Sequence, residues 1–260
     1  MAIAAVQKGR FVWYELATTD PDKAQAFYQE VLGWGAVPFE GGVGPYTTWM
    51  NGENPVGGLM ELSEPERQGG APPHWRAYIA TPDVTATVER ARQLGAHIIE
   101  PLIEVPTIGK MAFLTDPQGA LFAIFTPEEP TPGREGQPLA GEISWHELAT
   151  TDTNAAFEFY KDLFDWEITS DMDMGPMGVY RMYGQHGIPL GGIYNKPADM
   201  PAPPHWLLYA KVNNINDVVA RVTAQGGQVL NGPMEVPGGD LIAQCMDPQG
   251  AAFALHEAKA

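Results

Sequence analysis

Hydrophobic and polar positions follow two different periods along the first part of the chain. Residues 11–20 (FVWYELATTD) are rich in β-branched and aromatic side chains and predict a strand that ends in polar residues. The next stretch has apolar residues at the three- and four-residue spacing of an amphipathic helix. These apolar positions are Ala24, Phe27, Tyr28, Val31 and Leu32.

Polar and small residues mark where this helix begins and ends. Thr19 or Asp20 stands at the position that suits an N-cap, and Pro21 follows at the first helical position. Gly33 suits the left-handed conformation that ends many helices. The pattern therefore predicts a helix that begins near residue 21 and ends near residue 32.

The remaining elements of the first half repeat this order. Short strands are predicted at residues 36–40, 46–50 and 56–62. A further strand begins at Trp75, and a helix with apolar positions from Val84 to Leu94 follows it. Strands at 97–100, 110–115 and 120–125 complete the half, and DPQG at 116–119 predicts the hairpin turn between the last two. Each half thus has the order β-α-β-β-β twice.

Four short blocks occur twice in the same order, 131 or 132 residues apart. They are ELATTD at 15–20 and 147–152, PPHW at 72–75 and 203–206, EVP at 104–106 and 235–237, and DPQGA at 116–120 and 247–251. A segment rich in proline and glycine, 126–142, separates the copies and predicts an exposed connection. We therefore expect an α+β protein of two tandem domains, 1–134 and 135–260.

Charge and composition exclude several classes of function. The chain has 15 Lys and Arg against 32 Asp and Glu, a net charge of −17, so it lacks the basic surface that nucleic acids or anionic membranes require. No apolar run is long enough to span a bilayer, and the first residues lack the pattern of a signal peptide. The lone Cys245 excludes an internal disulfide. These features favour a cytoplasmic protein whose partner is a small molecule.

The repeat resembles the vicinal oxygen chelate superfamily, which includes glyoxalase I, bleomycin-resistance proteins and extradiol dioxygenases. The resemblance rests on the strand, Asp and helix opening with Phe27-Tyr28 and Leu-Gly-Trp, and on the closing Asp-Pro-x-Gly hairpin. It covers residues 10–127 and 142–257. It implies tandem glyoxalase-like domains of paired βαβββ modules, four modules in all, with a small-molecule cavity.

The resemblance also implies where a divalent metal would be held. Metal-dependent members use His, Glu and Gln donors from four strands. The positions of this chain that match three of these donors carry other side chains, namely Trp13 and Trp145, Arg76 and Leu207, and Ala123 and Ala254. We therefore expect no metal cofactor. The alternative is one divalent metal held elsewhere, by Glu147, His205 and His256.

Strand alternation places the other candidate residues on the face that is concave in this superfamily. In the first half these are Trp13, Glu15, Arg76 and Tyr78, and in the second half Trp145, Glu147, His205, Tyr209, Lys211 and His256. Glu15 and Glu147 are the candidate acid–base groups, because an apolar wall raises the pKa of a carboxyl. The alternative for Glu15 is a salt bridge with Arg76. Leu207 replaces that arginine in the second half, so Lys211, His205 or His256 is the expected partner of Glu147.

Several histidines have a structural alternative. His74 and His205 each follow two prolines, where an imidazole commonly bonds a backbone carbonyl at a hinge. His146 alternates with Glu147 and is therefore expected on the opposite face of the sheet.

Three functions compete at this point. The first is a metal-independent protein that binds a small, partly aromatic or hydrophobic molecule, as drug-sequestering members of the superfamily do. The second is a metal-dependent enzyme of the lyase, isomerase or dioxygenase type. The third is a structural or regulatory module whose cavities are filled by its own side chains. The chain is expected to be a monomer or a homodimer, because its two halves can complete each other.

Overall fold

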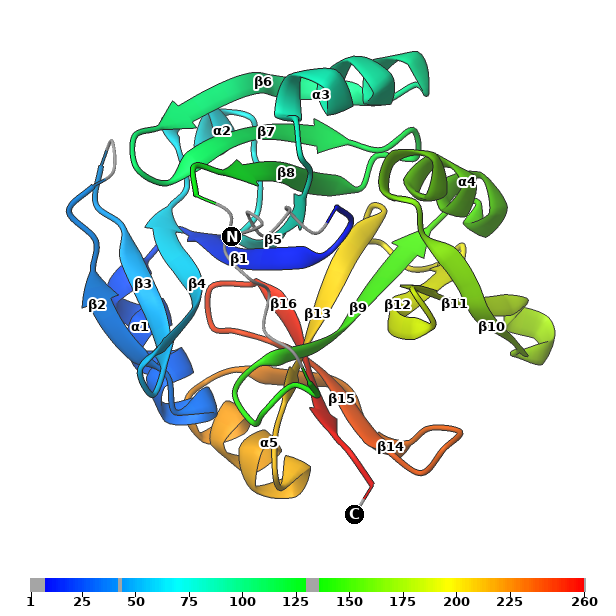
Figure 1. Cartoon of the computed structure of the whole chain (residues 1–260). Helices are drawn as coiled ribbons and strands as arrows, with labels where there is room; N and C mark the ends of the chain where they lie inside the picture. Colours follow the sequence, from blue (N-terminus) through cyan, green and yellow to red (C-terminus); the bar gives the residue numbers. More distant parts are fainter. Residues whose placement is uncertain (1–7, 42–43, 130–135, 260) are drawn as a thin grey trace. The chain divides into compact units, whose positions relative to one another are not determined.

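The computed structural model describes residues 8–41, 44–129 and 136–259, so the predicted boundary near residue 135 lies outside the described residues. These residues form two sheets of eight strands, with strand orders β2-β3-β4-β1-β5-β8-β7-β6 and β10-β11-β12-β9-β13-β16-β15-β14 (Figure 1). The order along each repeat is β-α-β-β-β twice, and the predicted α+β fold is confirmed.

The first repeat contains eight strands and three helices. They are β1 (Phe11–Thr18), α1 (Pro21–Leu32), β2 (Gly35–Pro38), β3 (Thr47–Asn51), β4 (Asn54–Glu61), α2 (Glu64–Gln68), β5 (His74–Ala80), α3 (Val84–Gln93), β6 (His97–Val105), β7 (Gly109–Thr115) and β8 (Leu121–Pro127).

The second repeat has the same order of strands and long helices, but no helix lies between β12 and β13, where α2 would be, and a short 3₁₀ turn lies between β10 and β11. Its elements are β9 (Ile143–Thr150), α4 (Thr153–Phe164), β10 (Glu167–Asp173), η1 (Gly175–Met177), β11 (Val179–Gln185), β12 (Ile188–Asn195), β13 (His205–Lys211), α5 (Ile215–Ala224), β14 (Gln228–Glu235), β15 (Leu241–Met246) and β16 (Ala252–Glu257).

Helix α1 begins and ends as its sequence predicts. Of the two candidate N-caps, Asp20 is the one used, and its Oδ1 accepts a hydrogen bond from the Lys23 amide. Gly33 ends the helix with φ of 73°, in the left-handed region that glycine occupies without strain. Helix α2 has only five residues and no buried residue, so it leaves no apolar periodicity in the sequence from which it could be predicted.

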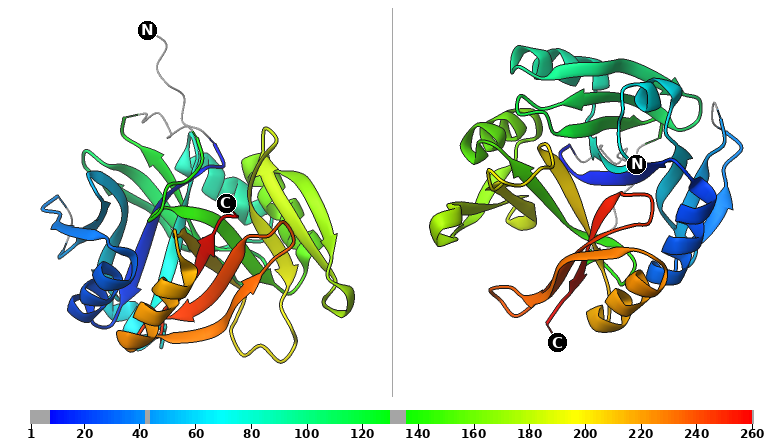
Figure 2. Two further views of the ribbon diagram at one scale, coloured as in Figure 1. Left: turned by 90° about the horizontal axis from the view of Figure 1, so that it is seen from below. Right: turned by 180° about the vertical axis from the view of Figure 1, so that it is seen from behind.

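The residues cluster into two compact units, and each unit takes segments from both repeats. The first, here the α3/α4 unit, comprises the described parts of residues 1–12, 77–135 and 146–206. The second, the α1/α5 unit, comprises those of residues 13–76, 136–145 and 207–260. In each unit a helix of the first repeat lies beside a helix of the second repeat. Figures 1 and 2 show these pairs, α1 with α5 and α3 with α4.

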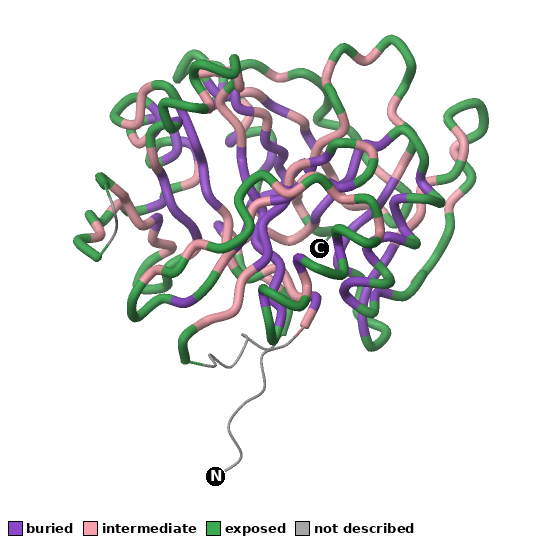
Figure 3. The backbone as a smooth tube through the Cα atoms, turned by 90° about the horizontal axis from the view of Figure 1, so that it is seen from above, coloured by how far each residue is buried: buried purple, intermediate pink, exposed green. Residues whose placement is uncertain are grey.

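The core of the α3/α4 unit is built from both repeats. Phe122 of β8 packs edge to face against Phe159 and Tyr160 of α4, and all three side chains are buried. Arg90 of α3 also forms a bidentate ion pair with Asp162 of α4, at 2.8 and 2.7 Å. Burial differs between the strands (Figure 3): β5 and β13 are mostly buried, whereas β6, β10 and β14 are mostly exposed.

An aromatic cluster forms the core of the α1/α5 unit. The Tyr28 ring lies within 5.3–6.0 Å of the rings of Trp34, Trp49 and Trp75, and 5.4 Å from that of Phe253. Trp75 packs against Tyr28 of α1, and its indole N–H donates to the Tyr28 hydroxyl. Throughout the described part of the chain, every helix is too short or too polar to cross a membrane.

Candidate functional site

The first carboxylate site lies in the α1/α5 unit, where β1 and β5 bring Glu15 and Arg76 together. Both residues are 5% exposed, and Arg76 Nη1 lies 3.1 Å from Glu15 Oε1. Arg76 Nη2 forms a second ion pair with Glu66 of α2, and Arg76 Nε donates to Nε2 of His74 at 3.1 Å. The alternative of a Glu15–Arg76 salt bridge is therefore confirmed.

Arg76 is held by two carboxylates and one imidazole, all within the same unit. Burial alone would raise the pKa of Glu66, but the positive charge of Arg76 and hydrogen bonds from Ser63 lower this pKa below its ordinary value. A guanidinium held in this way keeps its charge and its position. The arrangement is that of a buried ion pair, and Glu15 serves in it as the partner of a fixed cation.

Tyr46, which was not among the predicted site residues, lies beside Glu15 and Trp13. Trp13 Nε1 donates to the Tyr46 hydroxyl at 2.8 Å, and both side chains are half-buried. Burial raises the pKa of Tyr46, and the charge of Glu15 raises it further. The phenol lies directly against Gly58, where an added Cβ would meet the hydroxyl at 1.7 Å. Glycine at 58 therefore makes room for the tyrosine.

The second carboxylate site has the same plan in the α3/α4 unit. Glu147 of β9 is 7% exposed, and the Tyr180 hydroxyl of β11 donates to its Oε2 at 2.9 Å. The ring of Tyr180 stacks with that of Tyr194 on β12, with centroids 6.1 Å apart and planes 20° apart. Burial raises the pKa of Tyr194, and the charge of Glu147 raises it further. These two tyrosine rings therefore lie beside a buried carboxylate.

The glycine below the tyrosine is also repeated. An added Cβ at Gly192 would meet Cζ of Tyr180 at 2.1 Å, as one at Gly58 would meet Tyr46. Tyr46 and Tyr180 were missed because they are 134 residues apart, whereas the motif blocks are 131 or 132 apart. The repeated Gly-Gly pair on β4 and β12 is the signal that could have pointed to a bulky side chain above each.

The three groups expected to pair with Glu147 have other partners in the structure. The ring of His205 bonds the Pro203 carbonyl through Nδ1 at 2.8 Å, and the Lys211 ammonium donates to the Pro138 carbonyl at 2.9 Å. His256 lies between Ser144 Oγ at 2.8 Å and Asp240 Oδ2 at 3.1 Å. His74 bonds the Pro72 carbonyl in the same way as His205, so the hinge interpretation holds for both.

The positions that match the metal donors of the superfamily do come together in the second repeat. Leu207, Tyr209 and Ala254 form one buried cluster in the α1/α5 unit, and Trp145, Ile242 and Ala252 pack against it. We call these six residues the apolar cluster. None of its side chains binds a divalent cation in the way His or Glu does. The residues at these positions therefore do not fit the metal of the superfamily.

No other metal-binding group emerges within the described ranges. Among these residues, no three His, Cys, Asp or Glu side chains are arranged to hold a metal ion. The alternative ligand set of Glu147, His205 and His256 is not such a group.

Polar side chains border the apolar cluster. Gln244 on β15 donates to the Tyr209 hydroxyl at 3.2 Å. His256 follows Ala254 on the same face of β16, and it is the register partner of Lys211 on β13. Of the second-half candidates, the structure thus brings Trp145, Tyr209, Lys211 and His256 onto one part of the α1/α5 unit.

His146 and the candidate Tyr78 are placed by aromatic contacts in the α3/α4 unit. The ring of His146 stacks on Phe11 at 3.7 Å, and its Nδ1–H donates to the Leu190 carbonyl at 2.7 Å, so His146 faces away from Glu147 as predicted. Tyr78 is buried and packs edge to face against Phe113.

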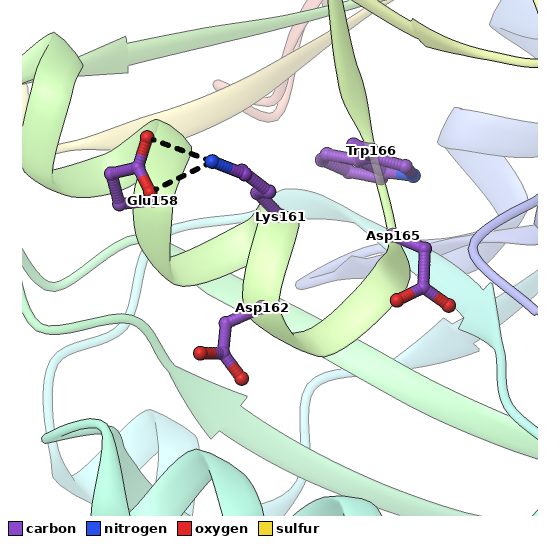
Figure 4. A pocket seen from close by; sticks show the side chains of 5 residues that line it. All are labelled: Glu158, Lys161, Asp162, Asp165 and Trp166. Carbon is purple, nitrogen blue, oxygen red and sulfur yellow. Dashed lines mark hydrogen bonds and ion pairs between the residues drawn. The ribbon is translucent and has the colours of Figure 1, made fainter.

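The surface of α4 has a hollow that is lined by none of the residues described so far as candidates. It has a volume of about 440 Å³ (Figure 4), and its lining residues are Glu158, Lys161, Asp162, Asp165 and Trp166. Asp162 and Asp165 in this hollow are already paired, with Arg90 and Lys8 respectively. It contains none of the candidate residues.

A family model and several known proteins match the sequence over almost its whole length. The model of the Glyoxalase/Bleomycin resistance protein/Dioxygenase superfamily matches residues 10–124 and 142–255. A protein of Mycobacterium tuberculosis named "Putative glyoxylase CFP32" is 33% identical over 248 residues, which cover 94% of this chain and 92% of that protein. The anthracycline biosynthesis protein DnrV of Streptomyces peucetius is 30% identical over 261 residues, 96% of this chain and 93% of that protein.

Solved structures show the same fold at low identity. The Mn(II)-bound glyoxalase from Novosphingobium aromaticivorans has a TM-score of 0.63 and 16% identity, and the match covers 97% of this chain and 82% of that one. The 2,3-dioxygenase LapB from Pseudomonas sp. KL28 has a TM-score of 0.65 and 11% identity, covering 100% and 94%. By the family match over both repeats, the chain belongs to the Glyoxalase/Bleomycin resistance protein/Dioxygenase superfamily.

Proposed function

We propose that the protein binds a small, partly aromatic or hydrophobic molecule on the apolar cluster, without a metal ion. The observation that carries this proposal is the convergence of Trp145, Leu207 and Ala254, at positions where metal-dependent members hold their ion. Apolar side chains at this place suit an apolar ligand surface and offer nothing to a divalent cation.

The side chains in and around the cluster support the same ligand class. Trp145 is half-buried, and an indole is a side chain that stacks well against a flat ring. The Tyr209–Gln244 pair and the His256–Asp240 pair add a few hydrogen-bonding groups beside the apolar residues. A mainly apolar surface with few polar groups is typical of sites for small organic molecules.

Tryptophan fluorescence tests this proposal directly. The purified protein, first treated with a chelator, is titrated with 2-naphthol and with anthraquinone-2-sulfonate, since two relatives have names that refer to anthracyclines, a class of aromatic compounds. We expect saturable quenching without added metal. Trp145→Phe should lose most of the quenching signal, and Leu207→Arg should weaken binding at least tenfold because it places a charge in the cluster.

The matched control is Trp13→Phe, the same change at the repeat counterpart in the first repeat. This variant should keep the wild-type affinity. The proposal is wrong if Leu207→Arg binds as tightly as the wild type. It is also wrong if the wild type binds these compounds only after Mn²⁺, Zn²⁺ or Fe²⁺ is added, which would favour the metal-dependent enzyme.

A further inference from the structure

Three polar side chains of the α1/α5 unit form a continuous hydrogen-bonded chain. Ser144 Oγ lies 2.8 Å from Nδ1 of His256, and Nε2 of the same ring lies 3.1 Å from Oδ2 of Asp240. Ser144 is on β9, His256 is on β16, and Asp240 comes directly before β15. A hydroxyl, an imidazole and a carboxylate thus follow one another in the order that a serine nucleophile requires. We call these three residues the triad.

Asp240 is held as a carboxylate. Its Oδ1 accepts a hydrogen bond from the Lys259 amide at 2.8 Å. This hydrogen bond, together with that from His256, lowers the pKa of Asp240, so the residue is ionised at neutral pH. Because an ionised carboxylate only accepts hydrogen bonds, the hydrogen-bond network assigns the proton of a neutral His256 ring to Nε2.

This tautomer makes Nδ1 of His256 the base that faces Ser144. Nδ1 then has a lone pair and no proton, so the hydroxyl at 2.8 Å donates to it. The Tyr209 carbonyl is the other acceptor near this hydroxyl, at the longer distance of 3.2 Å. In serine proteases Nε2 faces the serine and Nδ1 the carboxylate, and here the two ring nitrogens exchange these roles.

The first repeat has none of the three side chains of the triad. Their counterparts, at the offsets of the repeated blocks, are Val12, Gly109 and Phe125. The first repeat nevertheless forms a sheet with the same order of strands. The fold of a repeat therefore does not require these groups, and a role beyond folding is open to them in the second repeat.

The triad is accessible and lies next to the apolar cluster. The side chain of His256 is 18% exposed and that of Asp240 is 40% exposed, and Ser144 is half-buried. Ser144 directly precedes Trp145, and its Oγ contacts the Tyr209 carbonyl, so the hydroxyl is adjacent to two residues of the cluster. An apolar group held on the cluster is therefore a neighbour of the nucleophile.

We propose that Ser144 is the nucleophile of an esterase activity toward carboxylic esters of small aromatic alcohols. His256 is its general base, and Asp240 is the residue that positions His256. The chemical step uses none of the six residues of the apolar cluster. Only the choice of an aromatic alcohol rests on the proposed function.

The reaction consumes one ester and one water. As Ser144 Oγ attacks the carbonyl carbon, its proton passes to Nδ1 of His256. The bond between that carbon and the alcohol oxygen then breaks, and the proton passes to the leaving oxygen, which leaves the acyl group on Ser144. Water gives its proton to Nδ1 and attacks the acyl carbon in the same way, so the carboxylic acid is released and the serine hydroxyl is restored.

The test follows acyl transfer to the full chain after treatment with a chelator. The protein is mixed with para-nitrophenyl acetate at pH 7, and the release of nitrophenolate and the mass of the intact chain are measured. We expect a burst of nitrophenolate and the gain of one acetyl group, which peptide mass spectrometry should map to Ser144. Diisopropyl fluorophosphate should phosphorylate the same hydroxyl with loss of fluoride and stop the release.

Variants assign the three roles. Ser144→Ala should lose both labels, and His256→Gln should slow acylation at least about a hundredfold because it removes the base. Asp240→Asn keeps the shape but no longer holds the proton on Nε2, so it should lower kcat at least about tenfold and leave KM unchanged. Ser170→Ala and His97→Gln are the matched controls at exposed positions and should react as the wild type does.

Two results overturn the proposal. One is a rate of nitrophenolate release in Ser144→Ala equal to that of the wild type, because the reaction then belongs to another group. The other is a wild type in which neither reagent labels Ser144, and this measurement decides even if a variant does not fold. Labelling of Ser144 by the fluorophosphate without turnover of the ester supports the nucleophile and overturns the choice of aromatic esters.

Discussion

The hydroxyl of Tyr28 donates a hydrogen bond at 3.1 Å to Oδ2 of Asp247, a residue 219 positions further along the chain. The second repeat supplies the equivalent bond in the other direction, from Tyr160 to Asp116 at 3.1 Å. Each bond joins the first helix of one repeat to the closing hairpin of the other. The Phe-Tyr pair of one repeat thus meets the DPQGA block of the other, within one compact unit in each case.

Removing the Tyr28 hydroxyl should destabilise the protein. This hydroxyl also accepts a hydrogen bond from Trp75 Nε1 at 3.0 Å, so Tyr28→Phe leaves two buried polar groups without this partner. Such a loss costs about 1–3 kcal/mol in the free energy of unfolding. Urea unfolding of Tyr28→Phe measures it, and Tyr160→Phe should give a similar loss because Tyr160 accepts from Trp206 in the same way.

A double-mutant cycle separates this bond from the general effect of the substitution. Asp247→Asn and Tyr28→Phe, alone and together, should give a coupling free energy of about 0.5–3 kcal/mol. Effects that simply add would contradict a direct contribution of the Tyr28–Asp247 bond to stability.

The two repeats should not fold independently as monomers. A chain of residues 1–134 retains Tyr28 and Asp116, but it lacks Asp247 and Tyr160, their partners in the complete chain. We expect 1–134 and 135–260, produced separately, to be unfolded or to associate, and a 1:1 mixture to recover the near-ultraviolet circular dichroism of the whole chain. Sedimentation and denaturant unfolding check this, and a cooperatively folded monomer of either half would contradict it.

The sequence was sufficient to predict local structure but not the interleaving of the repeats. Asp20 begins α1 and Gly33 ends it, as predicted, because cap geometry depends on a few neighbouring residues. The partner of Tyr28, in contrast, could not be predicted. DPQGA is identical in both copies, so the pattern cannot tell Asp116 from Asp247. Only the packing of the whole chain decides between two equal candidates.

The candidate sites show the same division. Strand parity places Glu15 and Arg76 on the same face. Of the two interpretations of Glu15, an acid–base group or the partner of Arg76 in a salt bridge, the salt bridge is confirmed. The tyrosines above the carboxylates could not be placed, because the segment from Trp166 to Tyr180 is two residues longer than that from Trp34 to Tyr46. This difference shifts the two tyrosines out of the common spacing. Lys211 was expected near Glu147 because strand parity places both on one face and their charges are opposite, and its ammonium bonds the Pro138 carbonyl instead.

Replacing Arg76 alone should destabilise the protein more than replacing both Arg76 and Glu15. Arg76→Leu leaves the buried Glu15 without the guanidinium it faces, which for a pair of this kind costs about 3–5 kcal/mol in the free energy of unfolding. Glu15→Leu together with Arg76→Leu removes both charges, so the double variant should regain more than 1 kcal/mol of that loss. Urea unfolding provides the comparison.

An exposed arginine serves as the control for this prediction. Arg92 pairs with Glu89 on the surface of α3, where both side chains are more than half exposed, so Arg92→Leu should change stability little. A double variant less stable than Arg76→Leu alone would show that the ion pair has a net stabilising effect.

His146 should make the protein less stable as the pH falls. Burial lowers the pKa of His146 to about 3, whereas an unfolded chain protonates histidine near a pKa of about 6.5. Between these values the unfolded state binds a proton at this position that the folded state does not bind. The free energy of unfolding therefore rises with pH through this window, by at most about 1.4 kcal/mol per pH unit for this residue. The contribution of His146 to stability is lost on acidification.

The variant His146→Gln tests this slope. Glutamine can donate to the Leu190 carbonyl as His146 does, but it cannot titrate and cannot stack on Phe11. We expect lower stability at pH 7 and a shallower decrease in stability between pH 6.5 and 5 than in the wild type, measured by urea unfolding at each pH. His97→Gln, at an exposed position, should retain the wild-type slope. If the profiles of His146→Gln and the wild type run parallel, His146 is not the group that opposes protonation. The half-buried His74 and His205, whose pKa values are also lowered mainly by desolvation, are then the next to test.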